Sequence, residues 1–397
     1  MRDAVIVESV RTPIGKLGGA LSNVLVDFLA AKVIKEVVNR SELDPGLVDE
    51  VILGQAKQNA DSSNLARLAL LRAELPVQIP GYTLHRQCGS GLQAINNADM
   101  QIKLGLSDVV IAGGAESMST APYYIRQARY GYRSGNGLLL DPNTESQPYS
   151  QPIEEYGPLR MGDTAENLAK RYKIDRVEQD EFALRSQELA QRAINNGLFK
   201  SEIVPYEVNN RKDSFLFESD EHPRSTTLEK LSTLKPVFNP NGTVTAGNAS
   251  GRNDAASAVL MMSESIARER GFTPKARIVA HASSGVSPEI MGIGPVYSTQ
   301  KALNMSGLRL EDIGLIELNE AFSAQALAVI KELNLNLETV NVNGGAIALG
   351  HPIGATGAIL TTKLLHEMER RGEKYGLVTL CIAGGQGITT IFENLQV

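Results

Sequence analysis

Residues 41–55 read SELDPGLVDEVILGQ, and residues 306–320 read SGLRLEDIGLIELNE. The two segments align at an offset of 265, the difference between positions 306 and 41. Residues of similar side-chain type then coincide at the pairs Ser41/Ser306, Leu43/Leu308, Val48/Ile313, Val51/Ile316 and Leu53/Leu318. Farther along the chain, the tetrapeptide IAGG at 111–114 returns at 382–385. Because two such pairs occur in the same order, the sequence indicates an internal duplication.

Each half has a glycine-containing turn, then a helical pattern, then an apolar strand that ends in Gly-Gly. The helical runs are 89–104 and a second that begins near Pro352, and the strands are 109–112 and 377–383. The N-terminal segment adds a strand at 4–7, a glycine-rich loop and a helix at about 25–38. Strands that alternate with helices are typical of α/β folds. We therefore predict two related α/β halves, each with a largely parallel sheet.

The amino-acid composition changes between the halves, from about residue 121 to residue 245. This region is richer in Tyr, Pro, Asn and charged residues, and it contains a helical pattern over 164–195. It is typical of a lobe inserted between two duplicated units.

Bulk properties exclude some classes of function. The formal net charge of −6 argues against a general binder of nucleic acids or anionic membranes. No apolar run approaches the roughly 20 residues that cross a bilayer, and the N-terminus lacks the apolar core of a signal peptide. The chain has only two cysteines, which excludes a disulfide scaffold. We expect a cytoplasmic protein with reduced thiols.

The first candidate for chemistry is Cys88, in HRQCGSGLQAI at 85–95. It precedes a Gly-Ser-Gly turn that opens a helix, and the positive end of a helix favours a thiolate. One alternative is that the turn is only a helix cap and Cys88 packs beside it. Another is a dinucleotide fingerprint, G-x-G-x-x-A, with Asp108 nearly 20 residues later. The second alternative is weak, because GYTLHRQ is a poor strand and Asp108 lies at the wrong end of its strand.

The second candidate is His351, in NVNGGAIALGHPIGATGA at 341–358. Its many glycines allow close approach of backbone and ligand, and imidazole transfers protons near neutral pH. The repeat offset carries Cys88 to position 353, so His351 and Cys88 occupy nearly equivalent positions. If the halves pack about a pseudo-two-fold axis, the two loops face each other. A structural, hydrogen-bonded histidine is the alternative.

Two further candidates lie at the ends of strands. Cys381, in LCIAGGQG at 380–387, ends an apolar strand beside a Gly-Gly turn, where open α/β sheets bind ligands. Asn319 follows the apolar run 316–318, although it could simply cap the next helix. The five histidines are scattered, no C-x-x-C occurs, and the serine-hydrolase elbow and the phosphate loop are both absent. We expect no metal site.

Eight blocks in one order, covering essentially the whole chain, resemble the thiolase family of acetyl-CoA acyltransferases. They are VRTPIGKLGGAL (10–21), CGSGLQAI (88–95), GGAESMS (113–119), MGDTAEN (161–167), TAGNASG (245–251), NEAF (319–322), GGAIALGHPIGATG (344–357) and CIAGGQG (381–387).

The resemblance implies a role for each candidate. Cys88 is the nucleophile that accepts an acyl group, and His351 takes its proton and helps to bind the thioester oxygen. Cys381 removes a proton from the α-carbon of the second acyl-CoA. Asn319 holds a water in one oxyanion site, and the N–H groups of Cys88 and Ala383 form a second. Such donors matter because the loss of one typically costs about 10² to 10³ in rate.

The resemblance also implies the binding residues. Coenzyme A is a substrate, with no resident cofactor, and its expected contacts are Arg224 and Ser250. The expected walls of the acyl pocket are Met161, Met291 and Phe322. A solvated charge is the alternative for Arg224, and ordinary core packing is the alternative for the methionines.

The sequence departs from the family pattern at three positions. Ala383 replaces the usual glycine, which preserves the N–H donor if its φ is negative. Arg160 stands where many acetoacetyl-specific members have histidine, and Arg252 replaces a commonly apolar residue. The two arginines bear on the choice of substrate.

The fold that this resemblance implies is a duplicated, five-layered αβαβα fold of the α/β class, with two mixed sheets and an inserted loop domain. The N-terminal half spans 1–120 and is completed by 246–270, the C-terminal half spans 271–397, and residues 121–245 form the inserted domain, which is expected to bind CoA.

The implied activity is reversible condensation and thiolysis of acyl-CoA thioesters, with acetoacetyl-CoA as the expected substrate and an acyl-Cys88 intermediate in a ping-pong scheme. The alternatives are a longer-chain 3-ketoacyl-CoA thiolase of fatty-acid β-oxidation and a catalytically silent CoA- or lipid-binding protein. A decarboxylating ketoacyl synthase would lack the second cysteine, Cys381. A homodimer or homotetramer is expected.

Overall fold

The computed structural model describes residues 2–209 and 214–397. Two sets of strands repeat one order. In the N-terminal half the order is β4 (Gly81–Leu84), β3 (Glu50–Gly54), β5 (Val109–Ser117), β8 (Asn253–Ser263) and β1 (Ala4–Arg11). In the C-terminal half it is β10 (Leu315–Leu318), β11 (Tyr375–Ile382), β12 (Gln386–Asn394) and β9 (Ala276–Gly285).

Strand directions repeat as well. β3 runs parallel to β5, which pairs antiparallel with β8, and β8 pairs antiparallel with β1. In the other half β10 runs parallel to β11, followed by antiparallel β12 and β9. This matching order confirms the predicted duplication. A short antiparallel pairing of β1 with β9, at Val5 and Ile6, joins the two sheets into one continuous sheet.

The prediction of largely parallel sheets was wrong, because both sheets are mixed. β12 follows β11 through the turn 383–385 without an intervening helix, and strands joined by a tight turn run antiparallel. Gly384 and Gly385 make that turn, with φ values of 86° and 85°, in the left-handed region that glycine adopts without strain.

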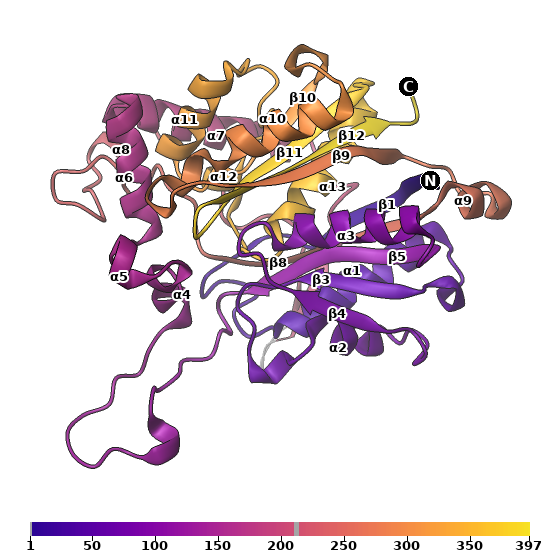
Figure 1. The fold of residues 1–397 in the computed structure, drawn as a ribbon, viewed down its shortest axis with the longest axis horizontal. Coiled ribbons are helices and arrows are strands. Elements are labelled where there is room, and N and C mark those ends of the chain that lie inside the picture. Colours follow the sequence, from indigo (N-terminus) through magenta and orange to yellow (C-terminus); the bar gives the residue numbers. More distant parts are fainter. Residues whose placement is uncertain (1, 210–213) are drawn as a thin grey trace.

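Helices fill three layers around the sheets (Figure 1). α3 (Ser90–Leu104) and α13 (Thr356–Arg371) lie between the sheets and share one apolar core with strands of both halves. α1 (Val26–Ser41) and α2 (Leu65–Arg72) cover the outer face of the N-terminal sheet. α10 (Gly294–Ser306) and α11 (Ser323–Leu333) cover the outer face of the C-terminal sheet. The predicted five-layered α/β class is therefore confirmed.

Three local predictions need correction. The helical pattern over 164–195 divides into α6 (Met161–Tyr172) and α7 (Arg176–Asn195), because Lys173 turns left-handed at φ 52° and Asp175 caps the second helix. α13 begins at Thr356, since residues from Pro352 form a turn before it. GYTL, taken as part of a poor strand, is β4, an edge strand parallel to β3.

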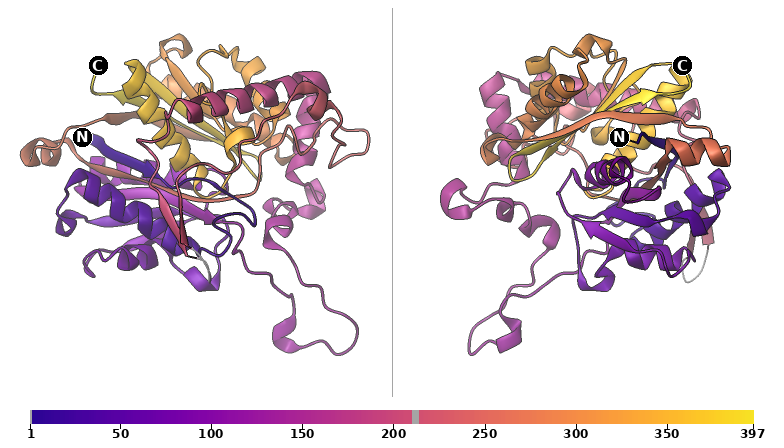
Figure 2. Two further views of the ribbon diagram at one scale, coloured as in Figure 1. Left: turned by 180° about the vertical axis from the view of Figure 1, so that it is seen from behind. Right: turned by 45° about the vertical axis from the view of Figure 1, so that its right-hand side comes forward.

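The remaining α-helices and β-strands are short. They are β2 (Gly15–Lys16), α4 (Pro142–Glu145), α5 (Ile153–Tyr156), β6 (Tyr206–Asn209), β7 (Ser214–Phe217), α8 (Leu228–Ser232), α9 (Glu264–Arg270) and α12 (Ala346–Leu349). An arm formed by residues 122–140 projects from the body (Figures 1 and 2). The proposed boundaries at 120, 245 and 270 stay predictions. No helix among the described residues is long and apolar enough to cross a membrane.

Candidate active site

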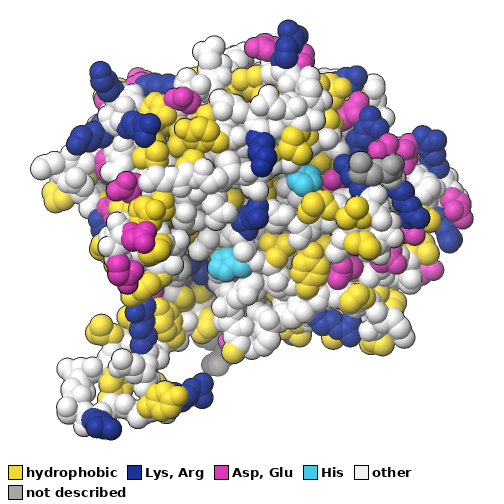
Figure 3. Space-filling view, viewed as in Figure 1, with side chains coloured by type: hydrophobic (Ala, Val, Ile, Leu, Met, Phe, Trp, Pro, Cys, Tyr) yellow, Lys and Arg dark blue, Asp and Glu magenta, His cyan; other side chains and the backbone are white. Residues whose placement is uncertain are grey.

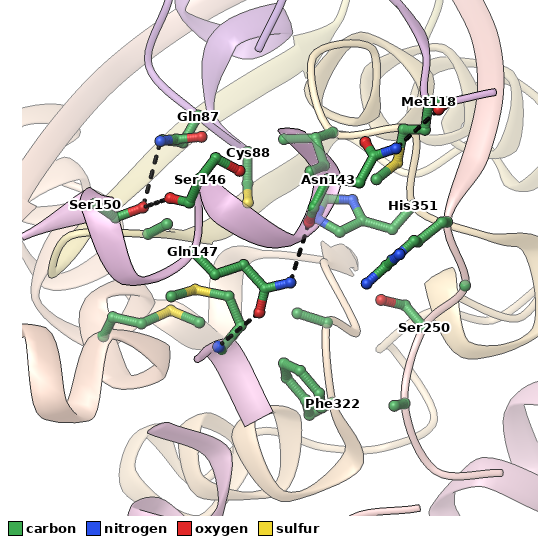
Figure 4. A pocket seen from close by; sticks show the side chains of 18 of the residues that line it. Gln87, Cys88, Met118, Asn143, Ser146, Gln147, Ser150, Ser250, Phe322 and His351 are labelled. Atoms are coloured by element: carbon green, nitrogen blue, oxygen red, sulfur yellow. Dashed lines mark hydrogen bonds between the residues drawn. The ribbon is translucent and has the colours of Figure 1, made fainter. Parts of the chain in front are cut away.

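A cavity of about 270 Å³ lies where the ends of α3, α13 and β11 meet the inserted region. Its lining brings together seven of the ten predicted site residues, which are Cys88, His351, Ala383, Ser250, Met161, Met291 and Phe322. Cys88 and His351 both lie in this cavity, although 263 positions separate them in the sequence (Figure 4). The duplicated fold explains this meeting, because each residue precedes the central helix of its own half.

A tight turn positions Cys88. Gly89 N–H donates to Arg86 O, and the Ser90 hydroxyl donates to Gln87 O, so the chain reverses just before α3 begins at Ser90. Gln87 adopts a left-handed conformation with φ 46°, which is uncommon outside glycine and is typical of constrained turns at functional sites. The helix therefore starts directly behind the sulfur.

Burial raises the pKa of the Cys88 thiol to about 11. The N–H groups of Ala383 and of Cys88 itself point at the sulfur and act in the opposite direction, as does the positive charge of Lys57. Ala383 does not have a positive φ, so the alanine keeps its N–H available where the family usually has glycine. A thiol that is protonated at rest needs a base to become a nucleophile.

His351, which lines the same cavity, is the candidate for that base. Its Nδ1 lies 2.7 Å from Thr356 Oγ1, whose hydroxyl donates to Pro352 O at 2.9 Å. Because a hydroxyl has one proton, Thr356 accepts the hydrogen bond from Nδ1–H, and Nε2 keeps its lone pair. Burial lowers the pKa of His351 to about 4. The imidazole is consequently neutral near pH 7 and can accept a proton at Nε2.

Cys381 lies behind the cavity surface, at the end of β11. Its side chain is fully buried and packs with Met291, Phe322 and Ala324. Burial raises its pKa far above the usual range, and the charge of Cys88 raises it further. The two sulfurs thus belong to one electrostatic environment.

Asn319 is also buried, and its N–H donates to Thr379 O. Neither polar atom of its side chain has a partner among the described residues, and the same holds for Ser323 Oγ and Gln325 Nε2. Buried polar atoms normally have partners, so these groups are suited to hold ordered water. Asn319 is not a helix cap, because α11 begins at Ser323 with Phe322 as its N-cap residue.

The structure does not bring Arg224 to this cavity. Its guanidinium donates to Ala246 O, and it lines a separate groove beside Gln187 and Glu188. Ser250 does line the cavity, and its N–H donates to Ala321 O.

Sequence reasoning missed one wall of the cavity. It consists of polar residues to which the sequence assigned no role: Lys57, Gln87, Asn143, Ser146, Gln147 and Ser150. The repeat held a signal for Lys57, because the offset of 265 carries position 57 to Phe322, a predicted wall residue. Residues 143–150 lie in the inserted region, which has no counterpart in the other half. Among the described residues, no group of three or more His, Cys, Asp or Glu side chains is arranged to hold a metal ion.

Comparison with known proteins gives one consistent result. The model of the thiolase N-terminal domain matches residues 4–265, and that of the thiolase C-terminal domain matches residues 272–394. The chain is 49 % identical over 398 residues to an acetyl-CoA acetyltransferase of Escherichia coli, covering all of both chains. It is 47 % identical over 401 residues to a beta-ketoadipyl-CoA thiolase of Pseudomonas aeruginosa, covering 99 % of this chain and 100 % of the relative. The crystal structure of the Bacillus anthracis acetyl-CoA acetyltransferase superimposes with a TM-score of 0.97 at 50 % identity, covering 100 % and 99 % of the chains.

Proposed function

The chain belongs to the thiolase family, and we propose from this premise that it is an acyltransferase that cleaves and forms carbon–carbon bonds between acyl-CoA thioesters. In the cleavage direction a 3-oxoacyl-CoA and CoA give acetyl-CoA and a shortened acyl-CoA. With acetoacetyl-CoA, the substrate that we favour, both products are acetyl-CoA. The observation that carries this proposal is the meeting of Cys88, His351 and Ala383 in one cavity with Cys381 directly behind it.

In the first half-reaction Cys88 attacks the 3-oxo carbonyl after His351 Nε2 takes its proton. The neutral imidazole and its fixed tautomer support this role. Negative charge then develops on the carbonyl oxygen, and the N–H groups of Cys88 and Ala383 are the donors for it. The bond between C2 and C3 breaks, and the acyl group stays on Cys88.

Cys381 gives a proton to the departing C2 carbanion, or removes that proton in the condensation direction. Its pKa, raised by burial, suits a group that must hold a proton until a strong base forms beside it. The enolate oxygen requires stabilisation, and a water held by the partnerless Asn319 side chain would supply it. CoA then removes the acyl group from Cys88, which makes the scheme ping-pong.

Coenzyme A enters this scheme as a substrate, and we propose no resident cofactor. Met161, Met291 and Phe322 are the proposed walls for the acyl group, and Ser250 is a proposed CoA contact at the cavity. Arg224 would contact CoA only where the ligand extends beyond the cavity.

The test separates the roles of the two thiols. Purified protein is given acetoacetyl-CoA with and without CoA, beside Cys88→Ala and Cys381→Ala, and acylation is followed by intact mass. We expect CoA-dependent cleavage by the parent and loss of turnover in both variants by at least about 10³-fold. Cys381→Ala should still acquire an acetyl group from acetyl-CoA, whereas Cys88→Ala should not. Acetylation of folded Cys88→Ala at the same rate would disprove the assignment.

If the folded parent cleaves only longer 3-oxoacyl-CoAs, the mechanism stands and the chain is the longer-chain thiolase of β-oxidation. Silence with every chain length would favour a CoA-binding protein without catalysis.

We also propose that the chain forms a homodimer or homotetramer. The arm of residues 122–140, which carries some hydrophobic side chains in Figure 3, supports this, because the exposed side chains of Tyr130, Leu138 and Leu139 lie on it. Light scattering of the parent, and of a variant with these three residues changed to serine, tests the assembly. Cytoplasmic residence also stays a proposal, supported by the need of Cys88 and Cys381 for a reducing environment.

A further inference from the structure

The cavity has two walls of different chemistry. Met161, Met291 and Phe322 make one wall apolar. The opposite wall consists of Lys57 and of polar side chains from residues 143–150, several of which are labelled in Figure 4. An acetyl group offers nothing to a polar wall, and the proposed mechanism gives Lys57 no role.

Lys57 is an unusual cation because it is buried and its Nζ is in direct contact only with neutral acceptors. The residue is 6 % exposed, and its Nζ donates to two neutral acceptors, Pro142 O at 3.2 Å and Ser146 Oγ. An ammonium has three N–H donors, so one has no partner among the described residues. No carboxylate of those residues lies within 4.0 Å of Nζ to form an ion pair. Burial lowers the pKa of Lys57, which is the sign of an incompletely compensated charge.

Glu116, the carboxylate whose charge acts most strongly on Lys57, already has hydrogen-bond donors. It accepts hydrogen bonds from the N–H groups of Ala56, Lys57 and Gly354. Glu116 therefore binds the backbone of Lys57, and its charge offsets that of the ammonium only from a distance, as does the charge of Asp141. A buried charge is costly unless it is paired, and an anion that enters the cavity would remove this cost.

The charged side chains that line the cavity are all cationic. Two cationic side chains, Lys57 and Arg252, line it, and no Asp or Glu side chain does. Arg252 is 41 % exposed and lies 3.7 Å from Asp141, so it has a partner and faces solvent. Lys57 is the deeper of the two, and its charge reaches Cys88. This only partly compensated positive charge thus lies in the same cavity as Cys88, the proposed acceptor of the acyl group.

We propose that Lys57 is a specificity-determining residue that binds a carboxylate at the far end of the acyl group, so that the chain accepts 3-oxo-dicarboxylic acyl-CoA substrates. This inference rests on the proposed thiolase function and extends it. The phosphates of CoA are a poorer match, because the long pantetheine arm separates them from the thioester. Ser146 and the apolar wall would hold the methylene chain between Cys88 and Lys57.

The reaction with such a substrate balances without any additional reactant. For 3-oxoadipyl-CoA, the Cys88 sulfur bonds to C3, the bond between C2 and C3 breaks, and Cys381 supplies the proton that C2 needs to become acetyl-CoA. The succinyl group stays on Cys88. The sulfur of CoA then attacks that thioester and loses its proton, which restores the Cys88 thiol and releases succinyl-CoA. The proton that His351 took from Cys88 passes to the Cys381 sulfur, so both groups return to their starting state.

The experiment compares two substrates that differ only in the distal carboxylate, 3-oxoadipyl-CoA and 3-oxohexanoyl-CoA. The measured quantity is the ratio of their kcat/KM values, from which the shared CoA contribution cancels. The parent should prefer the carboxylate. Lys57→Met should reduce the ratio about 10- to 100-fold, the equivalent of a hydrogen bond to a charged group. Lys57→Arg should retain most of it, and Arg252→Met should change the ratio less than Lys57→Met does, because Arg252 is paired with Asp141 and faces solvent.

Several outcomes would overturn the inference. A parent that prefers 3-oxohexanoyl-CoA would exclude carboxylate recognition. An equal fall with both substrates in Lys57→Met, in protein with unchanged thermal unfolding, would mean that Lys57 only tethers residues 142–146 or assists Cys88. Acetoacetyl-CoA thiolysis by the parent, measured in the same assay, decides the proposed function separately.

Discussion

His351 obtains its tautomer from one hydroxyl. Thr356 lies at the first position of α13, where its side chain can reach both Pro352 O and the imidazole one turn earlier. The sequence supplies this hydroxyl in HPIGATG, but nothing in the spacing shows that it holds the ring. Thr356 is a positioning residue, since it acts on the reaction through His351.

Thr356→Val removes the acceptor for Nδ1–H while keeping the shape of the side chain. We expect kcat/KM for thiolysis to fall about 10- to 100-fold, the range seen when a partner that orients a histidine is lost. Thr356→Ser should remain close to the parent. The pH dependence of kcat/KM is measured for all three, because a purely structural role would not change it. Equal activity of the Val and Ser variants would contradict the prediction.

The protonation of His351 gives a second prediction at this scale. Its pKa is lowered from 6.5 to about 4 by burial, so the unfolded chain binds more protons between these values. The stability that His351 contributes is therefore present above pH 6.5 and is lost as the pH falls toward 4. In ¹³C-histidine NMR, the signal that disappears in His351→Asn should not titrate between about pH 5 and pH 8. A midpoint near 6.5 would show that the imidazole is solvated.

Among the elements, α3 and α13 determine the spacing of the site. α3 begins two residues after Cys88 and α13 begins five residues after His351. The two helices approach until backbone meets backbone. A Cβ added at Gly91 would lie 2.9 Å from Ala358 N and from Gly354 O, and a Cβ at Gly357 would collide with Leu92 N. Glycine is required at both positions because no side chain fits between the helices.

Gly357→Ala tests this contact. We expect the helices to separate, with a loss of about 1 to 3 kcal/mol in the free energy of unfolding and a lower kcat, because Cys88 and His351 move apart. Urea unfolding and thiolysis rates are the measurements. Gly285→Ala is the matched control, since its added Cβ would have no neighbour closer than 3.9 Å. Indistinguishable behaviour of the two variants would refute the argument.

On the scale of the whole molecule, one buried arginine fastens the inserted region to the N-terminal sheet. Arg11, in β1, is fully buried, and its guanidinium contacts Glu202 at 2.7 Å and both oxygens of Asp220. Both carboxylates follow α7 in the chain, on the path that returns to β8. This connection holds the segment between α7 and β8 against β1.

Arg11→Met would leave two buried carboxylates without a cation. We expect the free energy of unfolding to fall by about 3 to 5 kcal/mol. Arg277→Met, the control, removes a half-exposed pair with Glu393, and such pairs contribute about 0 to 1 kcal/mol. Urea denaturation followed by circular dichroism measures both variants. Equal losses would mean that the Arg11 cluster contributes no more than a surface ion pair.

The sequence alone determined the duplication, the positions of the central helices and the identity of the candidate reacting groups. Hydrophobic periodicity and turn residues are local properties, so they can be recognised in the sequence alone. The repeat placed Cys88 and His351 at nearly equivalent positions of the two halves. It also allowed the prediction that their loops face each other, which the shared cavity confirms.

Only the tertiary structure decided the rest. The sheets are mixed because β12 turns back on β11, and α13 starts late because Pro352 begins a turn. The inserted region brings a polar wall to Lys57 and keeps Arg224 away from the cavity. These facts depend on which distant segments share space. Such contacts are fixed by sheet register and helix packing, and no pattern of neighbouring residues encodes them.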